Sequence, residues 1–200
     1  CLVHARCCME PSGEFFATAQ YLNVKGSDLF TPLLFSRSGQ NGRVFPPFLP
    51  DDAFTPIPED GGARILGCDA TPLFHRATGK ILVLGHTVRY REDSLHPVAG
   101  RRKTFYAVFD REKNMFSRMR FLETPGREDF FSAGNGSGQS AELPDGELLI
   151  PVYHKKDAET PQYMSAVLRC RFDGETLHCL DCGNSLAVEN EPRGVYEPSV

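Results

Sequence analysis

Cysteine supplies the first pattern in this sequence that could do chemistry. Cys179 and Cys182 are separated by two residues, which is a spacing found in zinc sites. A second pair with that spacing is missing, and the odd total of seven cysteines leaves at least one unpaired. Buried free thiols on strands fit this pattern better than a metal site, so no metal is expected.

A glycine-rich segment at residues 134–138 is the second such pattern. Glycine-rich loops bind phosphate when a lysine and a hydroxyl residue follow and a helix begins there. Neither signal follows Gly138. We therefore interpret the segment as a turn that leads into a strand.

Three polar rings form the third pattern. His86, Tyr153 and His154 lie at equivalent places, at the ends of two similar apolar runs. Imidazole can bind ligands or carry protons near neutral pH. Solvated strand ends are the simpler account of all three.

The elements that must position these residues recur along the chain. A tight turn with a glycine precedes a short apolar run three times, and the glycines lie at residues 13, 79 and 146. Their spacings are 66 (79 − 13) and 67 (146 − 79) residues. Because glycine accepts a positive φ, each phrase predicts strand, tight turn and strand. A hairpin that recurs at a nearly fixed period indicates a repeat architecture.

Each repeat is long enough for four antiparallel strands, which make one blade of a β-propeller. We place the repeats at about 1–60, 64–122 and 123–190, with the start of a fourth at about 191–200. Within them, residues 46–63 are expected to form a linker or surface loop, and residues 89–103 a protruding loop. The sequence predicts an all-β propeller region, the N-terminal half of a longer propeller.

Composition agrees with this fold class and excludes some functions. With 40% hydrophobic residues, 18 glycines and 15 prolines, the chain can bury a core and make many turns. A formal net charge of −4 with mixed signs argues against a nucleic-acid surface. No apolar run approaches the ~20 residues of a membrane span. No signal peptide is visible at the start of the chain.

At this level the repeats resemble the sialidase superfamily, six-bladed propellers whose turns carry Asp boxes of the pattern Ser-x-Asp-x-Gly-x-Thr-Trp. Residues 38–45 look like a worn copy, in which the serine, the glycine and a terminal aromatic remain. Gln40 and Val44 replace the aspartate and the threonine. The phrases at 68–73 and 197–200 also look like blade openings of this superfamily. The resemblance covers the whole chain.

The resemblance implies a substrate-binding set at the blade openings. Arg6 matches the first carboxylate-binding arginine of the family, although the usual Phe-Arg-Ile-Pro phrase is absent. Lys25 falls where a second arginine is usual, and lysine keeps the charge without the bidentate fork. Asp69 matches an aspartate that shapes the substrate pocket.

The resemblance also implies catalytic residues. Asp28 is the candidate acid/base, a role that needs a pKa raised by partial burial. Glu197 matches the glutamate that polarises a tyrosine nucleophile, which is how sialidases depart from the two-carboxylate scheme. The tyrosine and further arginines are expected beyond residue 200. This chemistry needs neither a metal nor a cofactor.

Taken together, these observations predict a sialidase-like exo-glycoside hydrolase that cleaves a terminal acidic sugar, sialic acid, with retention. The expected partner is a glycan, and the resemblance favours a secreted or periplasmic location. Two alternatives remain open: a non-catalytic glycan-binding propeller, and a propeller hydrolase for a neutral or uronic sugar. The three polar rings are then candidate sugar contacts.

Each site residue also has a purely structural alternative, because charged side chains mostly lie at the surface. Arg6 could pair with Glu10, and Glu197 with Arg193. Asp69 could cap a turn. Lys25 and Asp28 could solvate their loop.

Overall fold

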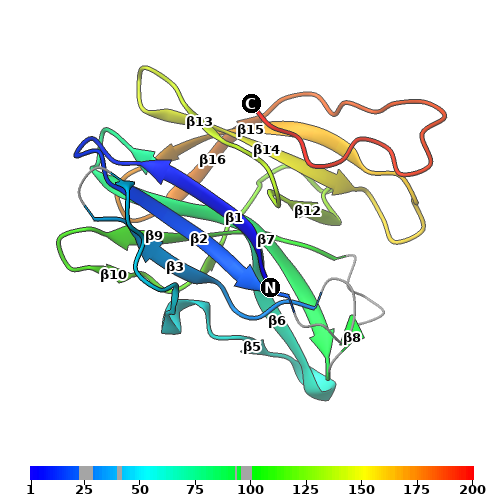
Figure 1. Ribbon diagram of the computed structural model, residues 1–200. Coiled ribbons are helices and arrows are strands. Elements are labelled where there is room, and N and C mark those ends of the chain that lie inside the picture. Colours follow the sequence, from blue (N-terminus) through cyan, green and yellow to red (C-terminus); the bar gives the residue numbers. More distant parts are fainter. Residues whose placement is uncertain (23–28, 40–41, 93, 96–100) are drawn as a thin grey trace.

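The computed structural model describes residues 1–22, 29–39, 42–92, 94–95 and 101–200. Strands dominate these residues, and they form three curled antiparallel sheets that follow one another along the chain (Figure 1). This arrangement confirms the predicted all-β, propeller-like fold. None of the described helices is long and apolar enough to cross a membrane.

The first sheet contains four strands in chain order: β1 (Leu2–Met9), β2 (Phe15–Tyr21), β3 (Leu34–Arg37) and β4 (Leu49–Pro50). Short 3-10 turns, η2 (Asp52–Phe54) and η3 (Asp60–Gly62), follow it. The segment expected as a linker or surface loop thus has structure of its own. Phe54 is buried, and the carbonyl of Ala53 accepts a 3.3 Å hydrogen bond from the amide of Met119.

The second sheet is built on three long strands: β6 (Ala63–His75), β7 (Lys80–Arg91) and β9 (Thr104–Asp110). Four two-residue strands pair with them: β5 (Ile57–Pro58), β8 (Ser94–Leu95), β10 (Met115–Phe116) and β11 (Arg120–Phe121). The loop expected at 89–103 begins later, because β7 continues to Arg91. Residues 93 and 96–100 of that loop lie outside the described residues.

The third sheet has the order β12 (Ser132–Gly134), β14 (Glu147–Lys155), β15 (Met164–Phe172) and β16 (Leu177–Cys182). A short strand, β13 (Ala141–Glu142), also pairs with β14. Residues 197–200, expected as the first strand of a fourth repeat, form no strand. Instead, the amide of Val200 donates a 3.1 Å hydrogen bond to the carbonyl of Gln139.

The three repeated turns take the conformation that the sequence predicts. Gly13, Gly79 and Gly146 have φ values of +83°, +67° and +84°. Each glycine amide donates to a carbonyl three or four residues earlier in the chain. Glycine adopts this left-handed backbone without a Cβ penalty, so the residue type dictates the turn.

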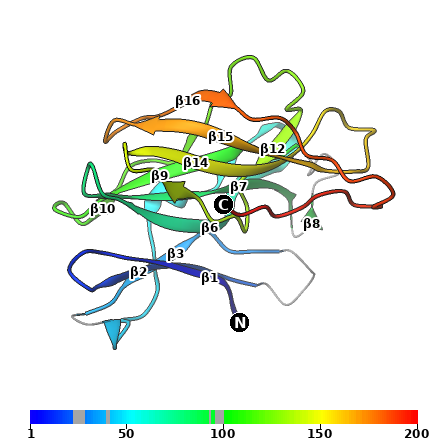
Figure 2. The same cartoon turned by 90° about the horizontal axis from the view of Figure 1, so that it is seen from above.

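The core lies on both faces of the second sheet, which is sandwiched between the other two (Figure 2). Along β7, Leu82 and Leu84 pack toward the third sheet, whereas Ile81 and Val83 pack toward the first. Side chains alternate between the faces of a strand, so burial of both faces requires a continuous apolar run. Each such side chain, fully buried, contributes about 1.5–3 kcal/mol.

None of the seven cysteines, all of which lie in the described residues, forms a disulfide. Cys68 and Cys170 are buried in the core, whereas Cys1 and Cys7 are exposed. Among the residues that the structure describes, no group of three or more His, Cys, Asp or Glu side chains is arranged to hold a metal ion.

Candidate functional site

Two strands that contact each other, β1 and β6, carry the same irregularity. In each, two residues oppose a single residue of the next strand, which makes a β-bulge. The first bulged residue is His4 in β1 and Asp69 in β6, and both have a φ of 53°. A non-glycine residue held in this region costs about 1–3 kcal/mol. Bulges of this kind re-aim side chains and are common beside active sites.

The same backbone conformation recurs in the two later parts of the chain. Ser137 has a φ of 58° and Glu197 a φ of 51°. The spacings along the series are 65 (69 − 4), 68 (137 − 69) and 60 (197 − 137) residues. Ser137 lies in a turn, as do the other described non-glycine residues with positive φ, Glu92, Asn114 and Asn190. Only His4 and Asp69 of the described non-glycine residues have this conformation within a strand.

Buried side chains of β2 fix the backbone around Asp69. Gln20 accepts a 2.9 Å hydrogen bond from the amide of Asp69 and donates to the carbonyl of Gly67 at 3.3 Å. Thr18 donates to the carbonyl of Ala70 at 2.7 Å. Both β2 side chains are fully buried. The strained conformation is thus held by the neighbouring sheet and does not depend on local preference.

The Asp69 carboxylate is buried, and only one of its two oxygens accepts a hydrogen bond from a described side chain. Its Oδ2 accepts a hydrogen bond from the Ser137 hydroxyl. Its Oδ1 faces Nδ1 of His4 at 3.7 Å and Nη2 of Arg6 at 3.8 Å, both longer than a hydrogen bond. Oδ1 and the His4 nitrogen have no hydrogen-bond partner among the described residues. Buried polar groups are normally paired, so this gap marks a place for a ligand or water.

The glycine-rich segment makes room for a histidine. It begins at Gly134, the last residue of β12, and turns at residues 136–137, and the short strand β13 begins at Ala141. A Cβ at Gly136 would overlap the imidazole of His86, and one at Gly134 would lie 2.7 Å from the His86 Cβ. Burial lowers the pKa of His86 well below its ordinary value, and the positive charges of Arg102 and His4 lower this pKa further. His86 is therefore neutral in the folded protein at neutral pH.

Beside His86 lies a cluster of tyrosines around one arginine. Nη1 of Arg102 donates to the hydroxyls of Tyr153 at 2.6 Å and Tyr196 at 2.8 Å. The Tyr153 hydroxyl also shares a 3.3 Å hydrogen bond with Nδ1 of His86. The Tyr153 ring packs against Tyr196 and Tyr163, with centroids 4.5 and 5.2 Å away. Burial raises the pKa of Tyr153, although Arg102 opposes the shift.

The interpretation of the three polar rings as solvated strand ends is wrong. His86, Tyr153 and His154 are only 6%, 1% and 0% exposed. His154 packs on Phe130 and shares a 2.8 Å hydrogen bond with the Ser185 hydroxyl. The apolar runs continue into the core at these positions, and their polar ends are buried by the adjoining sheet.

The sequence-predicted site residues have different outcomes in the structure. Arg6 and Asp69 come together at the bulges. Glu197 is exposed and has the backbone conformation of Asp69. Lys25 and Asp28 lie outside the described residues. The catalytic and binding roles of all five remain predictions.

The contacts of Glu10 and Asp69 bear on two of the structural alternatives, the pairing of Arg6 with Glu10 and the capping of a turn by Asp69. Glu10 forms ion pairs with Arg37 and Arg111, and its pairing with Arg6 is not seen. The Asp69 carboxylate binds Ser137 from the third part of the chain, which is not a turn-capping contact.

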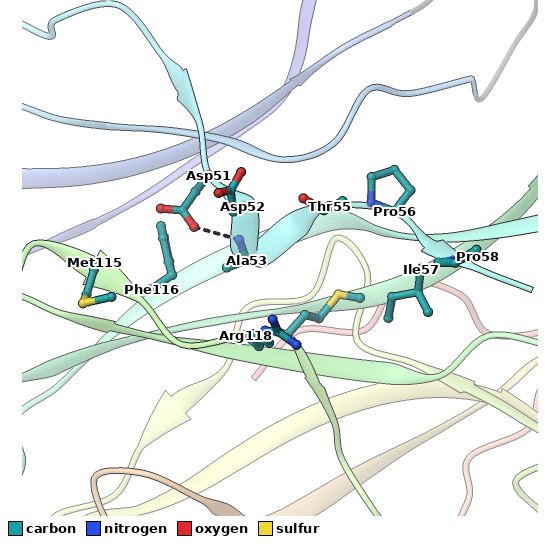
Figure 3. Close-up of a pocket in the computed structure, with 11 residues that line it drawn as sticks. Asp51, Asp52, Ala53, Thr55, Pro56, Ile57, Pro58, Met115, Phe116 and Arg118 are labelled. Atoms are coloured by element: carbon teal, nitrogen blue, oxygen red, sulfur yellow. Dashed lines mark hydrogen bonds between the residues drawn. The ribbon is translucent and has the colours of Figure 1, made fainter.

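A large groove lies elsewhere, between residues 51–58 and 115–119 (Figure 3). Its volume is about 840 Å³. Asp51 in its wall accepts a 2.8 Å hydrogen bond from the amide of Ala53 and so caps η2. The groove contains no residue of the bulges or of the tyrosine cluster. We place the candidate site at the bulges because strain and unpaired buried groups coincide there.

Two residues central to this site, Arg102 and Tyr196, were not singled out from the sequence. Arg102 lies in a run of three basic residues, which is typical of a solvated loop. Their hydrogen bond joins positions 94 residues apart. No local signal could have indicated it.

Comparison with known proteins finds a shared fold. No family model matches the chain, and no curated protein matches it. Among solved structures the chain is similar to a Hadza microbial sialidase, with a TM-score of 0.63 and 17% identity over 96% of this chain and 40% of that chain. It is also similar to an ulvan lyase from a new family of polysaccharide lyases, solved bound to -[GlcA(1-4)Rha3S]-, with a TM-score of 0.61 and 11% identity over 94% of this chain and 44% of that chain.

The chain spans less than half the length of either of these two structures. At such low identities the likeness establishes the architecture and leaves the chemistry to the site itself. The chain has the propeller-like fold that these two glycan-active proteins share.

Proposed function

We propose that this protein acts on a glycan that carries an acidic sugar, and that the sugar binds at the bulges. The observation that carries the proposal is the buried Asp69 carboxylate, whose Oδ1 finds no hydrogen-bond partner among the described residues and faces Arg6 and His4 at 3.7–3.8 Å. A sugar hydroxyl both donates and accepts, so one hydroxyl can donate to Oδ1 of Asp69 and accept from Arg6 or His4.

The two structural neighbours support the same class of ligand. One is named as a sialidase, and the other was solved with a chain that contains GlcA. Sialic acid and glucuronic acid both carry a carboxylate. An arginine-containing site suits such sugars, because guanidinium binds carboxylate through two parallel hydrogen bonds.

The finer proposal is sialidase-like hydrolysis with retention. Arg6 and Lys25 bind the sugar carboxylate, and Asp69 shapes the pocket. Asp28 protonates the leaving oxygen, and Glu197 accepts a proton from a tyrosine nucleophile. The matching backbone of Asp69 and Glu197, each at the opening of a repeat, supports their placement around one hollow.

The second candidate is a glycan-binding propeller without turnover. The worn Asp box at 38–45 and the lysine at residue 25 favour it, because both depart from the hydrolase pattern. Binding needs only the bulge groups described above, whereas hydrolysis also needs a positioned acid.

Turnover and binding of the chain separate these candidates. We would assay fluorogenic sialoside, β-glucuronide and β-glucoside, and measure binding of the corresponding methyl glycosides by calorimetry. The hydrolase predicts release from an acidic glycoside, a loss of about 10²–10⁴-fold in the Asp28→Ala variant, and retained binding in that variant. Binding without release supports the second candidate. Absence of both refutes the proposal.

A matched control guards against general effects of removing a carboxylate. Glu191 is exposed on the surface. Glu191→Ala should therefore leave turnover and binding unchanged, whereas Asp69→Ala should weaken both.

A further inference from the structure

One arginine beside this site lacks an acidic partner. Arg102 is partly buried, and no carboxylate in the described part of the chain forms an ion pair with it. Its Nη1 donates to the hydroxyls of Tyr153 and Tyr196, and its buried Nε has no acceptor there. A guanidinium presents five donors, so several of them remain available.

The neighbours of Arg102 do not neutralise its charge. Burial raises the pKa of Tyr153, and burial also raises the pKa of Tyr163, so both phenols stay protonated at neutral pH. Burial and the charge of Arg102 hold the pKa of His86 well below its ordinary value, so the imidazole is neutral. The described cluster therefore carries one uncompensated positive charge.

Other partly buried arginines of the chain show how unusual this is. Arg37, Arg89 and Arg127 each form an ion pair with a carboxylate at 2.8 Å or less. Arg6 also has an acid, Asp69, although at 3.8 Å. A partly buried cation without an anion is costly. It is expected where a ligand supplies the anion.

Contacts join Arg102 to the bulges. The Tyr153 hydroxyl bonds both Arg102 and His86, and the His86 ring rests on Gly136. The next residue, Ser137, donates to Asp69. Tyr196 is 39% exposed and adds an aromatic face beside the guanidinium. Aromatic faces with a few placed polar groups are typical of small-ligand sites.

We propose that Arg102 is the anion-recognising residue of the glycan site. Its guanidinium binds an oxyanion of the sugar, a carboxylate or a sulfate ester, while Tyr153 and Tyr196 hold the fork in place. Arg102 thus takes over the anion-binding role that the resemblance gives to Arg6, and Arg6, 3.8 Å from the Asp69 carboxylate, mainly orients Asp69. This inference rests on the proposed function and deepens it, because it assigns the acidic group of the ligand to a residue that the sequence did not indicate.

Calorimetry with three probes tests the assignment: methyl β-glucuronide, methyl β-glucoside 3-sulfate and methyl β-glucoside. Wild type should bind at least one anionic probe more tightly than the neutral one, and the tighter of the two identifies the oxyanion. Arg102→Gln should weaken the preferred anionic probe by about 10–100-fold, the usual effect of losing a charged hydrogen bond. It should leave methyl β-glucoside unchanged within twofold.

Arg101→Gln is the matched control, because Arg101 is the exposed neighbour in sequence. It should change no affinity by more than twofold. Arg102→Lys covers the case in which the glutamine variant unfolds: it keeps the charge, loses the fork, and should lose several-fold in affinity for the preferred anion only.

Two results overturn the inference, and they differ in what they say of the proposed function. If Arg6→Gln removes the preference for anions and the Arg102 variants keep it, the glycan site stands but its anion binds at Arg6. If wild type binds none of the three probes and does not bind the methyl sialoside either, both proposals fall.

Discussion

Buried carboxylates at the hairpin turns and at the bulges differ in how many polar partners they have. Beside the first turn, Glu10 is fully buried and forms ion pairs with Arg37 at 2.7 Å and Arg111 at 2.5 Å. Beside the second, Glu142 accepts from the backbone amide of Arg76 at 3.0 Å and from its Nε at 3.1 Å. At the bulges, Asp69 keeps one oxygen without a hydrogen-bond partner among the described residues.

On our proposal, this difference separates carboxylates that stabilise the fold from one, Asp69, that binds a ligand. A buried charge with several partners ties strands together, and its loss leaves those partners unpaired. A buried polar atom without a partner weakens the fold, so its retention needs another reason. Mutations at the two regions should accordingly change different measurements.

The largest effect is expected at the turns. Glu10→Ala should lower the free energy of unfolding by about 2–3 kcal/mol, because Arg37 and Arg111 lose their shared carboxylate. The figure is below that for fully buried pairs, since both arginine side chains are about a quarter exposed. Urea unfolding measures it. Glu14→Ala, which removes a 3.1 Å contact with Arg37 and a 3.0 Å hydrogen bond from the exposed Ser12 hydroxyl, should cost less than about 1 kcal/mol.

Gly136→Ala should have the next largest effect, and it should lower both the free energy of unfolding and the affinity for glycan. Its methyl group would overlap the His86 ring, so overpacking should cost about 1–3 kcal/mol and weaken glycan binding as well. Unfolding in urea and calorimetry report the two losses. Gly183→Ala is the control, because its Cβ would meet only the Val167 carbonyl, at 3.6 Å. Equal losses in the two variants would contradict the packing role of Gly136.

A pH series sharpens the comparison through His86. Its pKa is lowered in the folded state, so below the ordinary value near 6.5 the unfolded chain binds the extra proton first. Stability should therefore fall as pH drops from about 7, by up to about 1.4 kcal/mol per pH unit for this group. His86→Asn should flatten the slope between pH 7 and 5. An unchanged slope would show that other groups govern it, including His154, whose pKa burial also lowers.

The smallest stability effect is expected at Asp69. Asparagine tolerates positive φ and can keep an oxygen toward Ser137, so Asp69→Asn should change the free energy of unfolding by less than about 1 kcal/mol. Its effect on glycan turnover or binding should be large. A loss of stability comparable to that of Glu10→Ala would place Asp69 among the structural ion pairs and break the comparison.

Local sequence signals predicted the fold well where local chemistry decides it. Glycines 13, 79 and 146 forced the turns, and the apolar run after Gly79 indicated a strand, which the structure shows to be buried on both faces. Over residues 115–122 the structure has two short strands, β10 and β11, that both pair with β9. Arg6 and Asp69 lie 3.8 Å apart in the structure, and the roles that the resemblance gives them are still predictions.

Tertiary structure alone decided the site. The bulge at Asp69 depends on Gln20, 49 residues earlier, and the Asp69 carboxylate meets Ser137, 68 residues later. The same holds for the arginine among the tyrosines, since Arg102 reaches Tyr153 and Tyr196 across 51 and 94 residues. The sequence by itself determined strands and turns because backbone preferences act over a few neighbouring residues. Which polar groups remained without partners was decided only when three sheets packed together, because partnership is a property of the assembled core.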